Sequence, residues 1–440
     1  MILQKIFPSL LANFLIGLAL TFSVFAAEKP VELLTLAQTI ESAIEANLGL
    51  QSSQEGTKAA QATQKEQKTF FLPTFNVTYK FNRHDEASTF GGLVLGSTQE
   101  YSFTTTVTQP IFTGFANLNQ YKIASLGLDV AEINEKLVRQ NIIFNAKNIY
   151  FSMLEAQKLL DIAQKTVTQI QAQKEVSRNY YQVGMTPLND YLQAQVELAN
   201  AKQEFIVARN NLENAESDFN ILLRRPLDTP VKIDDITDYF SFKQDLDYCF
   251  SEADKNRLEI KVATLEVEIA EKEVTLARKN YYPSIDLQGS YFNVGTDWNV
   301  DGGTGTIDPS GWNILATASW NFWEWGRTTY GIHEKHSRLS QAQLQKTEIL
   351  DNIHLQVKKA YLRTQEAEKA IVTVGQAIEQ AKENFRINEE RYKAQVATST
   401  DVLDAQTLLS KTITNYYKAL YAFKISKAAL YRAIGQEIIE

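Results

Sequence analysis

The chain has 440 residues, of which 44% are hydrophobic and 22% are charged, so it can bury a substantial core. Its formal net charge of −8 argues against a nucleic-acid partner. The single cysteine excludes an intrachain disulfide and a thiolate zinc cluster, and four histidines are few for a metal or acid–base enzyme. The sequence has no serine–histidine–aspartate spacing and no phosphate-binding loop, so it predicts neither an enzyme nor a cofactor.

Residues 1–26 have the pattern of a secretory signal peptide. Lys5 supplies a basic start, residues 10–20 form an apolar stretch, and Val24-Phe25-Ala26 is a small-residue cleavage site. This pattern predicts an exported protein, with an uncleaved membrane anchor as the alternative. The rest of the chain has no run of 18 apolar residues, which predicts that no transmembrane helix follows.

The first part of the exported chain combines helical patterns with alternating ones. Helices are predicted over residues 34–47 and 52–69. The alternation of apolar and polar side chains then predicts two strands, at about 72–82 and 100–110, each with one apolar and one polar face. The glycine-containing segment between the two strands is predicted to be a loop.

A helix of unusual length is predicted over residues 119–183. No proline interrupts it, and at 1.5 Å per residue it would extend about 100 Å. Gly184 is suited to end this helix, and Thr186 is predicted to cap a second helix over 187–223, with Pro187 as its first residue. Apolar side chains recur every three or four residues along the first helix, as in a coiled coil, at Val138, Ile142, Ala146, Ile149, Met153, Ala156, Leu160, Ala163, Val167 and Ile170.

The second half of the chain repeats the first at a constant offset. Tyr181 and Asp190 correspond to Tyr392 and Asp401, each 211 residues later, and nine of the ten seam positions are again apolar. We therefore infer a tandem duplication of a helix–strand–strand–long helix–helix unit, joined by a proline-containing acidic segment at 224–250. The first copy is predicted at 27–223 and the second at 251–440, with strands at about 283–293 and 311–322 and long helices at about 329–394 and 399–434.

The predicted strands fit a lipid environment. Their apolar faces carry residues such as Phe75 and Ile314, and their polar faces carry residues such as Asn76 and Asn313. All five tryptophans lie between residues 298 and 325, as in an interfacial aromatic girdle. Four strands cannot close a barrel alone, and lipid does not tolerate an open sheet edge, so several chains are expected to pool their strands. The alternative is a soluble sandwich whose apolar face is covered by helices.

These features, in this order, resemble the TolC-type outer-membrane efflux proteins. The segments Gln109-Pro110-Ile111-Phe112-Thr113-Gly114 and Asp401-Val402-Leu403-Asp404-Ala405 also resemble that family's pattern. The resemblance implies a mainly α protein with a membrane β-barrel, located in the outer membrane of a Gram-negative-type cell with a large periplasmic portion. It also implies a homotrimer that forms a 12-stranded barrel and an α-helical periplasmic tunnel, with residues 224–250 in a belt around it.

The resemblance further implies a passive channel-tunnel with no catalytic activity. It would conduct drugs, small toxic compounds or secreted polypeptides from an inner-membrane transporter, through a periplasmic adaptor (membrane fusion) protein, across the periplasm and outer membrane. A soluble periplasmic coiled-coil adaptor or scaffold is the alternative, since adaptors also have paired helices.

The resemblance places a periplasmic gate at Asp401 and Asp404. Three residues apart on a helix, they share one face, and rings of carboxylates in a trimer would resist joint ionisation unless they bind cations or basic groups. Asp190 is the first-copy equivalent, although Gln193 replaces the second carboxylate, and Ala397 stands where the family representative has a basic residue. The alternative role of these aspartates is to stabilise a helix N-terminus.

The turns between the long helices are expected at the periplasmic tip, in contact with the adaptor. The predicted contact residues are Gly184, Met185, Thr186, Pro187, Val396, Ala397, Thr398 and Ser399. Tyr181 and Tyr392 are expected to pack at the helix ends rather than to act in function.

Overall fold

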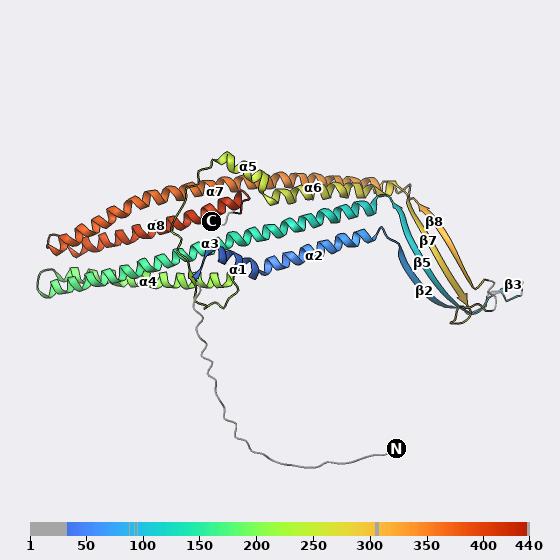
Figure 1. The fold of residues 1–440 in the computed structure, drawn as a ribbon, viewed down its shortest axis with the longest axis horizontal. Coiled ribbons are helices and arrows are strands. Elements are labelled where there is room, and N and C mark those ends of the chain that lie inside the picture. The colour runs from blue at the N-terminus through green and yellow to red at the C-terminus, as the bar shows by residue number, and fades with distance from the viewer. Residues whose placement is uncertain (1–32, 88, 92, 95, 304–307, 438–440) are drawn as a thin grey trace, which may run out of the picture.

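The computed structural model describes residues 33–437 except 88, 92, 95 and 304–307, so the predicted signal peptide at 1–26 lies outside the described residues. The molecule is elongated, with long helices over most of its length and a curved sheet at one end (Figure 1). Within the described ranges, no helix is both long enough and apolar enough to cross a membrane.

The first half places two helices before a pair of long strands and two long helices after it. Its elements are β1 (Leu33–Leu34), α1 (Leu36–Ala46), α2 (Leu48–Thr69), β2 (Thr74–Arg83), β3 (Thr89–Phe90), β4 (Leu93–Val94), β5 (Gln99–Thr113), α3 (Ala116–Gln182) and α4 (Leu188–Leu222). Leu34 is a strand residue rather than the first residue of the predicted helix, and β3 pairs with β4 inside the predicted loop.

The second half has the same order of main elements. It contains β6 (Lys232–Ile233), α5 (Leu246–Asn256), α6 (Leu258–Ala277), a 3₁₀ turn η1 (Arg278–Tyr281), β7 (Ser284–Gly295), β8 (Ser310–Ser319), α7 (Arg327–Lys393) and α8 (Ser399–Ala433). The predicted division between residues 250 and 251 therefore falls inside α5.

The long helices of the two halves begin and end at equivalent positions. Helices α3 and α7 each have 67 residues, α4 and α8 each have 35, and their ends differ by the same 211 positions. Left-handed backbone positions recur at this offset with glycine in only one copy, as at Gly184 and Gln395 or at Arg224 and Gly435. The conformation of each turn is thus kept where its residue type has changed.

The sheet has four antiparallel strands in the order β2-β5-β7-β8. Its register aligns side chains of one kind across the strands. One row joins Phe75, Val107, Gly289 and Ile314, and the next row joins Asn76, Thr106, Ser290 and Asn313. One face of the sheet is therefore largely apolar and the other largely polar, as the alternation predicts.

The helices lie side by side in two groups. Next to the sheet, α2 packs on α3, α3 on α6, and α6 on α7; toward the opposite end, the α3/α4 hairpin packs against the α7/α8 hairpin (Figure 1). The largest core lies midway, where α1 and the β1–β6 pair wrap around the long helices. There the buried Tyr150 hydroxyl donates to the carbonyl oxygens of Asp234 (2.8 Å) and Leu34 (3.3 Å), and burial raises the pKa of Tyr150 to about 12.

Candidate functional site at the tip of the hairpins

Two equivalent turns form the end of the molecule that is farthest from the sheet (Figure 1). After α3, Gly184 has φ +74°, its N–H donates to the Tyr181 carbonyl (3.0 Å), and the Met185 N–H donates to the Tyr180 carbonyl (2.8 Å). After α7, Gln395 has φ +63° and the same pair of hydrogen bonds follows. These are the bonds of a Schellman turn, which satisfies the last carbonyls of each helix.

The two return helices begin differently. Thr398 caps α8, since its side chain accepts a hydrogen bond from the Asp401 N–H (3.2 Å) and its own N–H donates to the Asp401 carboxylate (2.8 Å). The prediction that Thr186 caps α4 is wrong. Pro187, with φ −72° and ψ 158°, is the cap residue, the helix starts at Leu188, and the buried Thr186 hydroxyl has no partner among the described residues. Of the two return helices, only α8 therefore has a capping box.

Asp401 and Asp404 lie on an exposed face of α8, whereas Val402 and Leu403 between them are buried. Hydrogen bonds from the backbone and hydroxyl of Thr398, and next the charge of Arg391, lower the pKa of the Asp401 carboxyl. Within the protomer, Asp401 thus fills the capping role that was the alternative to gating.

Asp190, the counterpart of Asp401, has a different environment. Asp190 is only 7% exposed, and one of its carboxylate oxygens accepts a hydrogen bond from the Ser399 N–H at 3.3 Å. Asp190 therefore stabilises the N-terminus of α8, a helix of the other hairpin.

Around this contact lies a buried polar group that we call the tip cluster: Asp190, Ser177, Tyr392 and Ser399. The Ser177 hydroxyl lies 2.8 Å from the Ser399 hydroxyl and 3.2 Å from the Tyr392 hydroxyl. Burial, and next the charge of Asp190, raise the pKa of Tyr392. The cluster joins the α3/α4 hairpin to the α7/α8 hairpin through polar side chains that have little access to water.

Sequence reasoning found only part of this group. Tyr392 packs at the helix end as expected, but its counterpart Tyr181 is 41% exposed. Ser177 was not singled out, because a lone serine in a long helix has no signal that separates it from other polar positions. Of the predicted adaptor contacts, Met185 and Val396 are exposed, whereas Ser399 is fully buried within the protomer.

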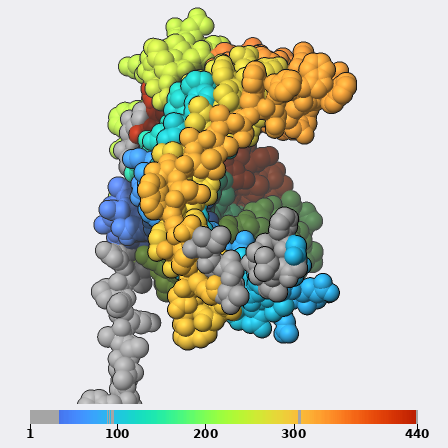
Figure 2. Space-filling view, turned by 90° about the vertical axis from the view of Figure 1, so that its right-hand side faces the viewer, coloured from blue at the N-terminus to red at the C-terminus, as the bar shows by residue number. Residues whose placement is uncertain are grey.

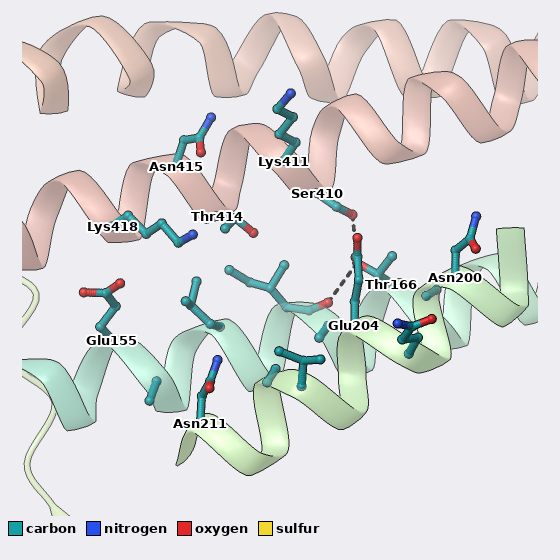
Figure 3. A pocket seen from close by; sticks show the side chains of 18 of the residues that line it. Glu155, Thr166, Asn200, Glu204, Asn211, Ser410, Lys411, Thr414, Asn415 and Lys418 are labelled. Carbon is teal, nitrogen blue, oxygen red and sulfur yellow. Dashed lines mark hydrogen bonds between the residues drawn. The ribbon is translucent and has the colours of Figure 1, made fainter. Parts of the chain in front are cut away.

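A groove of about 1150 Å³ is lined by α3, α4 and α8 (Figure 3). Its walls carry amide, hydroxyl and charged side chains; the Thr166 hydroxyl of α3 lies 2.8 Å from the Ser410 hydroxyl of α8. Glu155 and Lys418 lie on opposite sides of the groove. Burial raises the pKa of Glu155, and the nearby Lys418 charge partly offsets this rise.

Exposed aromatic side chains lie at both ends of the sheet. Trp320, Phe322, Trp323 and Trp325 follow β8 at its helix end, and Trp312 begins the same strand near the loops. Figure 2 views the molecule from the loop end of the sheet, and in this view β8 and the segment after it (orange) lie on the surface. No group of three or more histidine, cysteine or acidic side chains in the described part of the chain could hold a metal ion.

The fold and the tip thus define a helical hairpin protein with an exposed apolar sheet, and comparison with known families assigns its class. The sequence profile described as outer membrane efflux protein (OEP) matches residues 39–222 and 249–436. The chain belongs to the outer membrane efflux protein family, whose members are channels of the outer membrane and not enzymes.

Individual relatives agree with this assignment. The outer membrane protein TolC of Escherichia coli K12 is 22% identical over 432 residues, which cover 96% of this chain and 85% of that protein. The Campylobacter jejuni CmeC outer membrane channel has a similar structure, with a TM-score of 0.81, 17% identity and coverage of 91% of this chain and 85% of that one. The outer membrane protein VceC of Vibrio cholerae has a TM-score of 0.79 and 16% identity, and the match covers 91% of this chain and 96% of VceC.

Proposed function

We propose that the protein assembles as a homotrimer in which three four-stranded sheets close a 12-stranded barrel and twelve helical segments form a tunnel. The two outer strands of the sheet, β2 and β8, each pair with only one neighbour in the described protomer. Such unpaired edges are not stable in lipid unless another chain pairs with them. Tandem duplication accounts for the matched halves, since it supplies the same unit twice per chain.

Exposed apolar side chains on the helices support the same assembly. Five apolar side chains are between 48% and 72% exposed in the single protomer: Val196 and Ile206 of α4, and Leu344, Leu355 and Leu362 of α7. Soluble helices bury such positions against a partner helix. A second and third copy of this chain would cover them.

In this assembly the apolar face of the sheet meets lipid and the polar face lines a water-filled channel. Phe75 on the apolar face is 74% exposed. Trp312 lies in β8 and Trp320 directly follows it, eight residues later, which corresponds to about 26 Å of extended chain and matches the height of the apolar band of outer-membrane barrels. The polar rows offer hydroxyl and amide groups to solutes in transit.

The function that follows is passive export from an inner-membrane transporter and a periplasmic adaptor across the periplasm and outer membrane, with drugs, small toxic compounds or polypeptides as cargo. The exposed turns at Met185 and Val396 are the surfaces we assign to the adaptor. The observation that carries the proposal is the single-chain sheet with one exposed apolar face, open edges and a long helical extension, in a member of a family of outer-membrane channels.

We assign the gate to the tip. Asp401 and Asp404 would form two carboxylate rings around the axis of the trimer, and rings of this kind select and hold cations. Asp190, buried in the tip cluster, would act instead by holding the two hairpins of a protomer together. Opening would then require the hydrogen bonds of the tip cluster to break.

Extraction and mass measurement test the assembly. The expressed protein should leave the membrane fraction only with detergent and should run at three times the protomer mass. Release by salt alone as a monomer would contradict the channel and favour a soluble coiled-coil adaptor.

The gate has its own test. The double variant Asp401→Ala/Asp404→Ala should conduct more than the wild type in planar bilayers and should be blocked less by multivalent cations. Equal conductance and equal cation block in both proteins would remove these aspartates from the gate.

A further inference from the structure

Four of the basic side chains near the helix end of the sheet form one group. Lys65 and Lys68 lie at the end of α2, Lys122 lies at the start of α3, and Arg278 follows α6. We call these four residues the basic rim. All four are exposed, and none makes an ion pair with another described residue.

The basic rim lies on one side of the wall formed by α2, α3 and α6. A groove of about 440 Å³ on the other side is lined by Thr63 and Gln67 of α2 and by Gln120 and Ala124 of α3. Two residues along a helix correspond to a rotation of about 200°. Lys65 is two residues from both Thr63 and Gln67, and Lys122 is two residues from both Gln120 and Ala124. These lysines therefore point away from the groove.

Arg278 follows the same geometry on the third helix. The groove is lined there by Glu273 and Ala277, and five residues separate Arg278 from Glu273, a rotation of about 140°. In the proposed tunnel we assign the groove to the inner side of the wall, which places the basic rim on the outer side.

An aromatic collar separates the basic rim from the strands. Phe70 and Phe71 follow Lys68 before β2, and Tyr281 and Tyr282 follow Arg278 before β7. All four rings are more than 40% exposed. Aromatic side chains of this kind lie at the level of lipid headgroups, so a cation one turn further from the strands is at the depth of lipid phosphate.

The charge at the opposite end of the sheet has the other sign. The described residues there carry one basic side chain, Arg83, and six acidic ones: Asp85, Glu86, Glu100, Asp297, Asp301 and Asp308. At the helix end, Glu66 is the acidic residue within the basic rim, and the next carboxylates on its outer side, Asp129 and Glu271, lie about two turns further along their helices. The apolar face of the sheet is therefore bordered by basic side chains at its helix end and by acidic side chains at its loop end.

We propose that the basic rim binds the phosphate groups of anionic phospholipids in the leaflet that faces the helices. This inference rests on the proposed function, because it requires the strands to cross a bilayer. Each lysine or arginine close to an anionic lipid surface strengthens binding about fivefold, so four per protomer give a preference for anionic over zwitterionic phospholipid. The acidic border repels the same lipids and keeps the orientation of the channel unambiguous.

The full chain, purified in detergent, carries its own probe for this contact. Trp320, Trp323 and Trp325 lie at the collar and can transfer energy to dansyl-labelled phosphatidylglycerol or phosphatidylcholine in mixed micelles. For the wild type, half-saturation with the anionic lipid is expected at a concentration at least fivefold lower than with the zwitterionic lipid. The ratio should approach one in a variant with all four substitutions: Lys65→Gln, Lys68→Gln, Lys122→Gln and Arg278→Gln.

A matched control removes the same charge elsewhere. Four exposed lysines far from the collar are replaced, and this control should keep the wild-type ratio: Lys202→Gln, Lys261→Gln, Lys358→Gln and Lys359→Gln. A wild-type ratio near one, or an unchanged ratio in the basic-rim variant, would overturn the inference. Displacement of the lipid by millimolar inorganic phosphate, at ionic strength matched with chloride, would also overturn it, since it would indicate a site for free phosphate.

The two proposals fail in different ways. Energy transfer from neither lipid would mean that the strands do not meet lipid, which contradicts the proposed function itself. Equal transfer from both lipids would leave the channel intact and overturn the basic rim alone.

Discussion

Replacement of Asp190 by alanine is expected to loosen the contact between the two hairpins of a protomer. The carboxylate is buried and accepts a hydrogen bond from the N–H of Ser399. Ser399 is the first residue of α8, a helix of the other hairpin. Alanine removes the acceptor and leaves the N–H of a fully buried residue without a partner.

The magnitude follows from this geometry. A hydrogen bond to a charged group contributes about 1.5–3 kcal/mol, and a buried donor without a partner costs about 1–3 kcal/mol. The length of 3.3 Å places this bond toward the weak end. A loss of about 2 kcal/mol would raise the population of separated hairpins about 30-fold.

A buried reporter thiol can measure this population. Ala194 is fully buried in a cluster that also contains Leu403 of the other hairpin, so a cysteine at position 194 reacts only when the hairpins part. The native Cys249 is fully buried and is replaced by serine to remove its background. When opening and closing are fast relative to labelling, the labelling rate follows the open population.

The expected rate in Asp190→Ala is about 30 times that of the parent. Asp404→Ala is the matched control, because this carboxylate lies on the exposed face of α8 and away from the tip cluster, and its rate should stay within about twofold of the parent. An unchanged rate in Asp190→Ala would refute the role of this carboxylate in holding the hairpins together.

Three further predictions concern the turns, the groove and the sheet. Gln395→Gly should raise the free energy of unfolding by about 0.5–1 kcal/mol in thermal unfolding, since Gln395 has φ +63°, whereas Gly184→Ala should lower it by about 1 kcal/mol; opposite signs would contradict the turn geometry. Because burial raises the pKa of Glu155, its neutral form stabilises the fold at low pH and this contribution is lost as the pH rises through the raised pKa. Glu155→Gln should therefore raise Tm at about pH 7 but not at about pH 4, and a lower Tm at pH 7 would exclude this cause. Val77→Arg, on the apolar face, should weaken folding into lipid vesicles by about 2–4 kcal/mol, while Thr78→Arg on the polar face should have little effect in the same gel-shift assay; equal losses would show that neither face is reserved for lipid.

The long helices and the strand faces could be predicted because each depends on a pattern inside one segment. The coiled-coil seam and the absence of proline predicted a helix over 119–183, and α3 runs over Ala116–Gln182. The alternation around Phe75 and Asn76 predicted faces that the strand register reproduces. Strand β5 extends to Thr113 because an irregularity at Ile111 lets the ladder continue past Pro110, which the alternation alone did not predict.

The tip could be located from the sequence, but its contacts could not. Asp190 and Asp401 hold equivalent positions in the repeat, but their burial differs. Asp190, on the α3/α4 hairpin, packs against the start of α8, whereas Asp401 faces solvent. The cap of α4 could have been predicted correctly from the repeat. The offset of 211 aligns Thr398 with Pro187, so the first copy has no threonine at the cap position. Ser177, by contrast, gains its role only from the packing of α3 against α8.

In the proposed assembly, this chain forms a trimeric channel through a membrane. Single-channel recording of the purified wild-type protein in planar bilayers tests it most directly. Stepwise openings of uniform size, with block by multivalent cations added on one side only, are the expected result, because the aspartates lie at one end of the molecule. The absence of channel openings, from a protein that remains soluble without detergent, would contradict the trimeric channel.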